Sequence, residues 1–357
     1  MSASTETRTW DAIVTTTYDA YRTTLIDNIF KSNPAMMEFK RAGGTRTEDG
    51  GVQIIEPLMY GKNSTIRSYE GYEVIDTTPQ EGLTSAIFPW AQVAGSITLS
   101  RKERRQNSGK HQIINLVSAK IKQAEMSMQE RFSEYLFAAG KYNTVQPSKD
   151  PAGFLAMIPT VPSSFDAGGI SVSANTWWRN KVQGNGGTLW TWISDTGDTP
   201  AAATGINAMN SIYNNCSKGP GGPPNVILCS QYLFEQYQTG VLPLARVPAN
   251  QEAADLGFPN LRFNGATLYW DENYASANIS DPQGGVSAQT SSAGAYFINT
   301  KFISFVSDSQ SEFIRTPFVR PANQDADTSL ILWMGNLTIN NRRKHGILED
   351  QDITAIQ

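Results

Sequence analysis

Hydrophobic and polar positions alternate with a period of two at Val52–Tyr60 and again at Trp90–Ser100, which predicts two β-strands. Ile54 and Leu58 share one face of the first strand, and Ile97 and Leu99 share one face of the second. The polar, turn-rich segment between them would form the tip of a long hairpin arm, with residues 90–100 as the return strand. Because Pro57 and Pro89 cannot donate to a ladder, neither strand is expected in mid-sheet.

A two-stranded ribbon is only marginally stable in water by itself. The predicted arm also carries exposed aromatic positions, at Tyr60, Tyr69, Tyr72, Phe88 and Trp90. We therefore expect the arm to lie on a surface outside its own core, and a neighbouring copy of the chain could supply that surface.

A single apolar stripe predicts one long helix from about Gly109 to Ala139, with Ser108 as its N-cap and Gly140 as its stop. The stripe recurs at spacings of three and four residues. Its members are Ile114, Val117, Ile121, Ala124, Met128, Phe132 and Tyr135. One stripe indicates a helix with one buried face.

The rest of the chain predicts an N-terminal arm, a compact α/β unit and a strand-rich final third. Helical spacing covers Tyr18–Lys31, and Asn33-Pro34 begins a short helix that ends at Gly43-Gly44. The α/β unit is predicted from a helix at 200–217, a strand at 225–229, a helix capped by Ser230 at 231–239 and a strand at 261–270. The final strands are predicted at Tyr296–Val306, Glu312–Arg320 and Leu330–Ile339.

Composition is consistent with a protein that assembles. Charged residues make up 17% of the 357 residues, against about 25% in a typical globular protein. Interfaces are depleted in charge because desolvating a charge is costly. A formal net charge of −4 argues against a dedicated nucleic-acid binder, which would be strongly basic. No apolar run reaches the roughly 20 residues of a membrane span, and the first ten residues lack a signal-peptide core.

Catalytic and metal-binding patterns are missing from the sequence, so we expect no enzyme activity and no cofactor. The chain lacks a Walker A loop, a dinucleotide fingerprint and a C-x-x-C pair. His111 and His345 each lie beside basic residues, which disfavours a protonated imidazole. Cys216 and Cys229 could pair or bind a metal, but buried free thiols are the simpler expectation. Asp195 and Asp198 fit a solvated turn better than a calcium loop.

Two basic clusters allow two interpretations. The first is Arg101, Lys102, Arg104 and Arg105, where the arm joins the helix, and the second is Arg342, Arg343, Lys344 and His345. Charge runs are usually solvated. Alternatively, one or both clusters contact the acidic tip of a neighbouring arm, where opposite charge would fix the register between copies.

Five features follow one another along the chain: residues 51–61 (GVQIIEPLMYG), residues 68–72 (SYEGY), the strand at 90–100, the long helix after it, and residues 335–343 (GNLTINNRR) followed by His345-Gly346. In these features the chain resembles the major capsid proteins of tailed bacteriophages. These motifs concern packing and turns, and their order along the chain carries the match. The same fold is shared by herpesvirus capsid floors and encapsulins.

The resemblance implies an α+β fold with an N-terminal arm, an extended hairpin called the E-loop, a peripheral domain with a long spine helix, and an axial α/β domain. Carried over to this chain, the N-terminal arm is 1–47, the E-loop 48–99, the peripheral domain 100–190 and 296–357, and the axial domain 191–295. The contacts expected between copies are at Tyr60, Lys62, Arg67, Tyr69, Tyr72, Glu73, Trp90, Arg101, Lys102, Arg104, Arg105, Arg342 and Arg343.

The function implied is that of a coat protein forming hexamers and pentamers of an icosahedral shell around double-stranded DNA, which it would contact without sequence specificity. It would be assembled in the host cytoplasm and end in the virion, with a portal and a separate scaffolding protein as partners. No membrane partner is expected. The alternatives are an encapsulin-like compartment shell or a virion tail or decoration protein. A hydrolase with an unrecognised site is a further alternative from another class.

Overall fold

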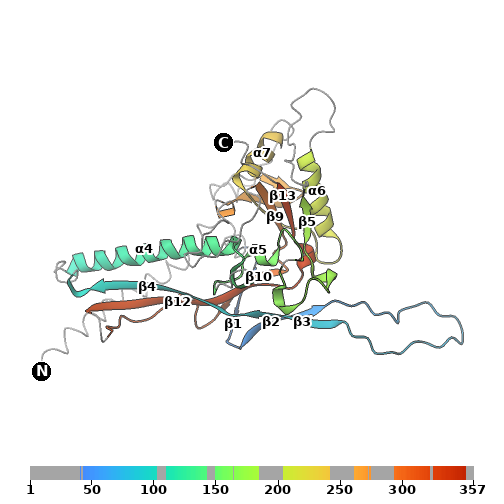
Figure 1. Ribbon diagram of the computed structural model, residues 1–357, viewed down its shortest axis with the longest axis horizontal. Coiled ribbons are helices and arrows are strands. Elements are labelled where there is room, and N and C mark those ends of the chain that lie inside the picture. The colour runs from blue at the N-terminus through green and yellow to red at the C-terminus, as the bar shows by residue number, and fades with distance from the viewer. Residues whose placement is uncertain are drawn as a thin grey trace.

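The computed structural model describes residues 41, 43–102, 110–142, 149–163, 165–184, 204–241, 261–271, 273–274, 293–321 and 325–350. The helices predicted within residues 18–44 therefore lie almost entirely outside the described residues. Figure 1 shows three parts: an arm that projects from the body, a long helix over a strand ribbon on the opposite side, and a sheet flanked by two helices. Within the described ranges, no helix is both long and apolar enough to cross a membrane.

The longest strand, β12 (Ala326–Ile339), is the centre of a five-stranded sheet. It pairs antiparallel with β4 (Ala91–Ser100), β10 (Ile303–Asp308) and β11 (Ile314–Arg315). The fifth strand, β1 (Thr45–Glu48), runs parallel to β10 at the edge. Apolar residues alternate along the β12–β4 ribbon because only one of its faces is covered.

Helix α4 (Lys110–Phe137) lies over the ribbon, close to its predicted bounds. Five members of the predicted stripe have described side chains, and Ile114 and Val117 lie outside the described side chains. Four of the five belong to or pack on the core that includes the ribbon, and the fifth, Tyr135, is half-buried. Phe132 sits at the centre of this contact, edge-on to Trp333 with ring centroids 4.8 Å apart. Trp333 in turn stacks on Phe305 at 5.2 Å. The helix therefore has one buried face, as its stripe predicted.

The second sheet has six strands in the order β5-β13-β9-β6-β8-β7. Helices α6 (Thr204–Ser217) and α7 (Gln231–Val241) cover one of its faces, and the end of α4 with α5 (Phe154–Met157) packs on the other. The strands are β5 (Lys181–Gly184), β6 (Val226–Cys229), β7 (Leu261–Phe263), β8 (Ala266–Trp270), β9 (Ala293–Ile298) and β13 (Gly346–Asp350). Ser230 caps α7 as predicted, because its Oγ accepts a hydrogen bond from the Leu233 N–H at 3.3 Å.

Two predicted strands are each divided by a turn. The strand predicted at 261–270 reverses at Asn264-Gly265, where both residues have positive φ, and so forms the β7–β8 hairpin. The strand predicted at 296–306 is divided at Asn299–Phe302, which sends β9 to one sheet and β10 to the other. Strand β9 therefore crosses the predicted boundary between residues 295 and 296, and it pairs with β6 of the predicted axial domain. The other predicted domain boundaries stay predictions.

The arm begins as a two-stranded sheet of β2 (Gln53–Met59) and β3 (Leu83–Pro89). The predicted return strand at 90–100 is therefore wrong, because that segment is β4 and pairs with β12. Both strands of the arm, β2 with Pro57 and β3 with Pro89, lie outside the larger sheets. Short 3₁₀ helices complete the fold: η1 (Gly140–Tyr142), η2 (Ala167–Gly169), η3 (Thr176–Trp178) and η6 (Arg342–Lys344). The described helices and the strands of three sheets confirm the α+β class.

Candidate assembly interface

The base of the arm packs on its own chain, which corrects the expectation that the arm needs a foreign surface along its whole length. Strand β2 buries alternate residues, with Ile54 fully buried and Leu58 6% exposed. Opposite them on β3, Phe88 is fully buried in the same core. Gly168 of η2 allows this close approach, because a Cβ there would lie 2.7 Å from the Cβ of Ala86. The base is thus part of the body.

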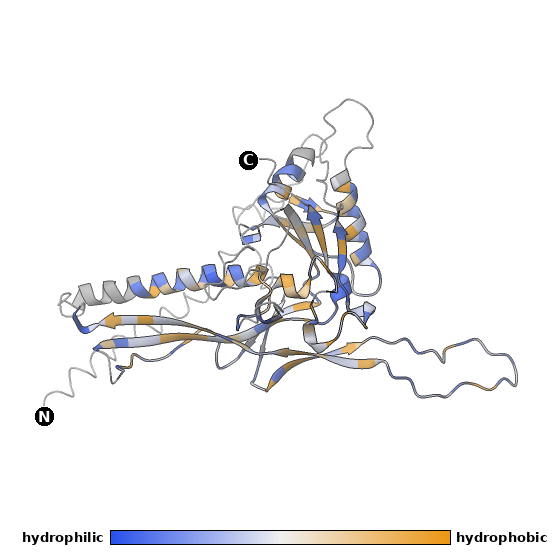
Figure 2. Cartoon of the chain, in the orientation of Figure 1, coloured by the Kyte–Doolittle hydropathy of each residue, from blue (hydrophilic) through white to orange (hydrophobic). Residues whose placement is uncertain are grey.

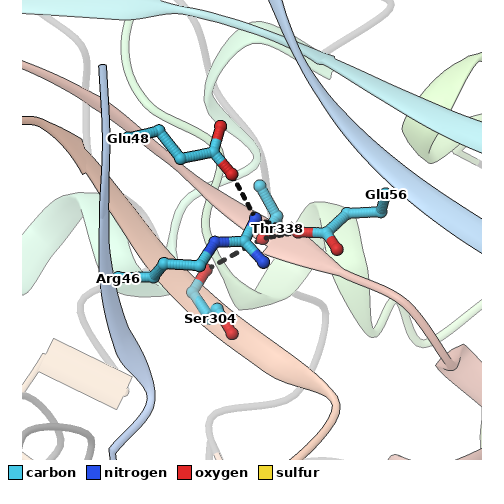
Figure 3. Close-up of polar contacts among 5 residues, drawn as sticks. All are labelled: Arg46, Glu48, Glu56, Ser304 and Thr338. Carbon is cyan, nitrogen blue, oxygen red and sulfur yellow. Dashed lines mark hydrogen bonds and ion pairs between the residues drawn. The ribbon is translucent and has the colours of Figure 1, made fainter.

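A buried carboxylate on the inner face of β2 ties the arm to the larger sheet. Glu56 is 5% exposed, and its Oε1 accepts hydrogen bonds from Arg46 Nη2 at 2.6 Å and Thr338 Oγ1 at 3.0 Å. The same guanidinium lies 2.8 Å from a carboxylate oxygen of Glu48. Figure 3 shows these groups converging from β1, β2 and β12. A buried charge is stable only when it is paired and hydrogen-bonded in this way.

Substituting Glu56 with alanine is expected to lower the free energy of unfolding by about 2–3 kcal/mol, because the Arg46 guanidinium and the buried Thr338 hydroxyl lose a charged acceptor. Denaturant unfolding of the full chain would measure the change. The matched control is Glu48→Ala, whose more exposed carboxylate binds the same guanidinium and should matter by less than about 1 kcal/mol. Equal effects of the two substitutions would contradict the role given to Glu56.

Two aromatic contacts fix the arm where it leaves the body. Tyr60 stacks on Trp177 with ring centroids 5.2 Å apart and an interplanar angle of 19°. Trp90 donates its indole N–H to the carbonyl of Gly51 at 2.9 Å, which joins the two ends of the hairpin at its base. The contact residues predicted at Tyr60 and Trp90 therefore have partners in their own chain, and Tyr60 keeps 41% of its surface exposed.

Beyond Tyr60 the two limbs of the arm separate into an open tip. The last cross-strand backbone bonds run from Tyr60 N and Gly61 N to the carbonyl of Gly82. The limbs are then joined by two side-chain bonds, Ser64 Oγ to Gln80 Oε1 at 2.7 Å and Arg67 Nη2 to the Val74 carbonyl. Each limb carries a local turn, at Asn63 and at Asp76, whose carboxylate has a lowered pKa because Thr78 donates to it. Figure 1 shows this tip standing clear of the body.

The tip and the outward face of the hairpin expose large apolar side chains, which is unusual for a surface that meets only water. On the outward face, two cross-strand pairs are exposed, Ile55 with Ile87 and Met59 with Leu83. Figure 2 shows hydrophobic and hydrophilic positions mixed along the tip. The exposed apolar side chains of the arm are Val52, Ile55, Met59, Tyr60, Ile66, Tyr69, Tyr72, Val74, Ile75, Leu83 and Ile87.

The structure thus brings out an apolar surface that the sequence interpretation missed in part. Lys62, Tyr69, Tyr72 and Glu73 are exposed on the tip as predicted candidates, but the outward pairs of β2 and β3 were overlooked. The signal was present at Ile54-Ile55 and Leu58-Met59, where neighbouring residues on opposite faces are both apolar. Such a strand is apolar on both faces and therefore needs cover on both.

The first basic cluster is only partly described. Arg101 donates its backbone N–H to the Asp325 carbonyl, and its guanidinium lies 3.8 Å from the Asp325 carboxylate. Lys102 is exposed. Arg104 and Arg105 lie outside the described residues, so their predicted contacts stay predictions.

The second basic cluster corrects the prediction of a solvated or intersubunit surface. Arg342 is fully buried and donates to the carbonyls of Met157, Phe165 and Ala156 at 2.8, 3.1 and 3.3 Å. Its predicted contact with a neighbouring copy is wrong, because its own chain surrounds it. Arg343, between the buried residues, is exposed.

Lys344 and His345 are buried beside Arg342 at the junction of the two sheets. The Lys344 ammonium donates to the carbonyls of Ser217, Gly219 and Gly222, which end α6 and begin the loop after it. His345 Nδ1 accepts the Asn299 N–H at 3.3 Å. Burial, together with the nearby Arg342 charge, lowers the pKa of His345 to about 3. The imidazole is therefore neutral.

The remaining candidate chemistry is structural within the described residues. Cys216 and Cys229 are buried free thiols, as expected, and burial raises the pKa of Cys216 to about 12. The described side chains include no cluster of three or more histidine, cysteine or acidic residues that could hold a metal. His111, Asp195 and Asp198 lie outside the described side chains.

No protein-family model and no curated protein matches this chain. Solved structures do match, at low sequence identity. The chain is similar to the capsid asymmetric unit of cyanophage A-1(L), with a TM-score of 0.60, 14% identity and coverage of 88% of this chain and 92% of that chain. It is also similar to the capsid of Myoviridae phage XM1, with a TM-score of 0.51, 12% identity and coverage of 87% and 90%.

Proposed function

We propose, from the tailed-phage capsid fold that this chain has, that it is a coat protein whose copies build a closed icosahedral shell of hexamers and pentamers around double-stranded DNA. The observation that carries the proposal is the apolar surface of the arm. Its two outward cross-strand pairs and the aromatic residues of the tip are exposed in one chain. Burying them against a second copy would remove a large apolar area from water.

The division of the arm into two parts supports this assignment. The inner face of β2 and β3 is held by the body through Ile54, Glu56 and Phe88. The outward face and the tip have no such cover within the described residues. A rigid base that presents an apolar extension is suited to reach over an adjacent copy, because little order is lost when the contact forms.

Deleting Lys62–Glu81 is expected to abolish closed shells and to leave the fold intact. Gly61 and Gly82 would then form the turn of a shortened hairpin, which is sterically simple because their backbones already approach closely: a Cβ on Gly61 would lie 3.0 Å from Gly82 Cα. Electron microscopy of the purified protein would report shells, and thermal unfolding would report the fold. A control is Val161→Ser, which removes a 56% exposed apolar side chain that is not part of the hairpin sequence.

Shells of normal appearance from the deletion variant, with the control also normal, would contradict the role of the tip. An encapsulin-like compartment is the second candidate, since the same fold would build it. Nuclease-protected double-stranded DNA inside purified particles supports the coat protein, and a protein cargo supports the compartment. A portal and a separate scaffolding protein are the partners expected for the coat protein.

A further inference from the structure

A groove of about 560 Å³ lies between β4 and α4, well away from the arm. One wall is the strand from Val93 to Thr98, and the other is the helix face that includes Lys120, Ala124 and Arg131. Small side chains line much of it, and its floor is apolar where Ile97 and Met128 are buried. Six residues of extended chain, about 20 Å long, match the length of the strand wall.

The strand wall is an open sheet edge. The backbone bond from Arg101 N to the Asp325 carbonyl sets the alternation of the β4–β12 ladder, so that Ala94, Ser96 and Thr98 direct their N–H and C=O groups away from β12. Lys120 Nζ reaches over and donates to the Thr98 carbonyl at 2.9 Å. The backbone groups of Ala94 and Ser96 on that side make no hydrogen bond with any described residue.

Apart from the Thr98 carbonyl that Lys120 binds, two features show that this edge is unprotected against pairing. Natural sheet edges are usually blocked by charge, proline or a bulge, whereas β4 has neither a charged residue nor a proline. Gly95 lies in mid-strand, where a Cβ would have only the Met128 Cε nearby, at 3.7 Å. A glycine inside a strand often marks a place where another backbone approaches closely. A strand edge beside a helix is a known arrangement for accepting an extended peptide.

We propose that this groove binds the N-terminal segment of the chain, with residues 12–17 added as a strand to the free edge of β4. Residues 18–40 connect the proposed strand to the described chain, and these 23 residues span at most about 80 Å when fully extended. Their sequence at Ala12–Thr17 is Ala-Ile-Val-Thr-Thr-Thr, six uncharged residues of which five are β-branched. Such residues favour extended structure on a half-buried surface. Asp11 and Asp19 flank the run, and the groove carries two basic side chains, Lys120 and Arg131, of which Arg131 also pairs with Glu134 at 2.7 Å.

Hydrogen exchange of the full-length chain tests the proposal. The backbone amides of residues 12–17 are expected to exchange at least about tenfold more slowly than in a free peptide of the same sequence. Ser96→Pro should abolish this protection, because it removes the free donor of the edge and is tolerated where the N–H faces away from the ladder. Ser96→Ala is the matched control, since it keeps the N–H and changes only an exposed side chain.

Unprotected amides at 12–17 in the wild-type chain would overturn the proposal, as would protection that survives Ser96→Pro. If the Ser96→Pro chain unfolds, a second measurement decides. Cysteines placed at Thr15 and Ser96 should form a disulfide on oxidation, within one chain or between two, while the native cysteines are buried. Cysteines at Thr78 of the tip and Ser96 should not. The result is independent of shell formation, so that failure here leaves the proposed function untouched.

Discussion

Replacing Arg342 with alanine is expected to lower the free energy of unfolding by about 3–5 kcal/mol. The substitution opens a cavity and leaves the carbonyls of Ala156 and Met157, which are buried, and of Phe165, which is partly buried, without their donor. Burial lowers the pKa of this guanidinium to about 10, because desolvation disfavours its charged form. Denaturant unfolding of the full chain would measure the loss.

The adjacent exposed Arg343 provides the control for this prediction. Arg343→Ala removes the same charge from the same 3₁₀ helix and should change the free energy of unfolding by no more than about 0.5 kcal/mol. A similar small effect for both alanine variants would show that η6 contributes little to the junction of the two sheets.

Stability is expected to fall as the pH drops from about 6.5 to about 3, because the folded chain cannot protonate His345. The pKa of this imidazole is 6.5 when unperturbed and about 3 when folded. Between these values the unfolded state binds the proton and the folded state does not, so the free energy of unfolding decreases as the pH falls. The loss is complete below pH 3 and amounts to about 5 kcal/mol, at 1.36 kcal/mol for each pH unit.

Thermal unfolding at several pH values would measure this dependence. His345→Gln supplies a neutral side chain that can still accept the Asn299 N–H, so its pH profile should be flatter over the same interval. Parallel profiles for the wild-type and variant chains would assign the acid sensitivity to other groups.

The sequence predicted which segments form helices and strands, but it did not predict which strands pair with each other. The stripe of α4 and the alternation in β2 and β12 reflect burial on one face, which is a local property, and all three elements lie near their predicted bounds. An alternation with a period of two does not determine which strand a given strand pairs with in a sheet. Residues 83–89 and 91–100 are both extended and meet at Trp90, so that the alternation alone could not distinguish the strand that returns along β2 from the strand that pairs with β12.

The sequence predicted the surface position of candidate residues in the turn-rich tip. It did not predict the position of a residue that is buried by contacts with distant parts of the chain. Tyr69 and Tyr72 were placed on the exposed tip, because turn residues around them prevent a packed strand. Arg342 was misplaced for a physical reason. A run of basic residues indicates a solvated surface unless a set of carbonyls binds it, and those carbonyls come from residues more than 170 positions away.

The central position of β12 has a consequence for synthesis of the chain. The arm base is completed only when Asn336 Nδ2 donates to the Pro89 carbonyl, a contact that spans 247 residues. At about 5–20 residues per second, the ribosome needs about 10–50 s to make that interval. During this time Glu56 lacks Thr338, and the inner face of the hairpin lacks the part of its cover that β12 supplies. Nascent chains therefore carry a hairpin whose apolar inner face is incompletely covered. We expect aggregation to increase with the number of chains that are in this state at the same time, as in rapid overproduction.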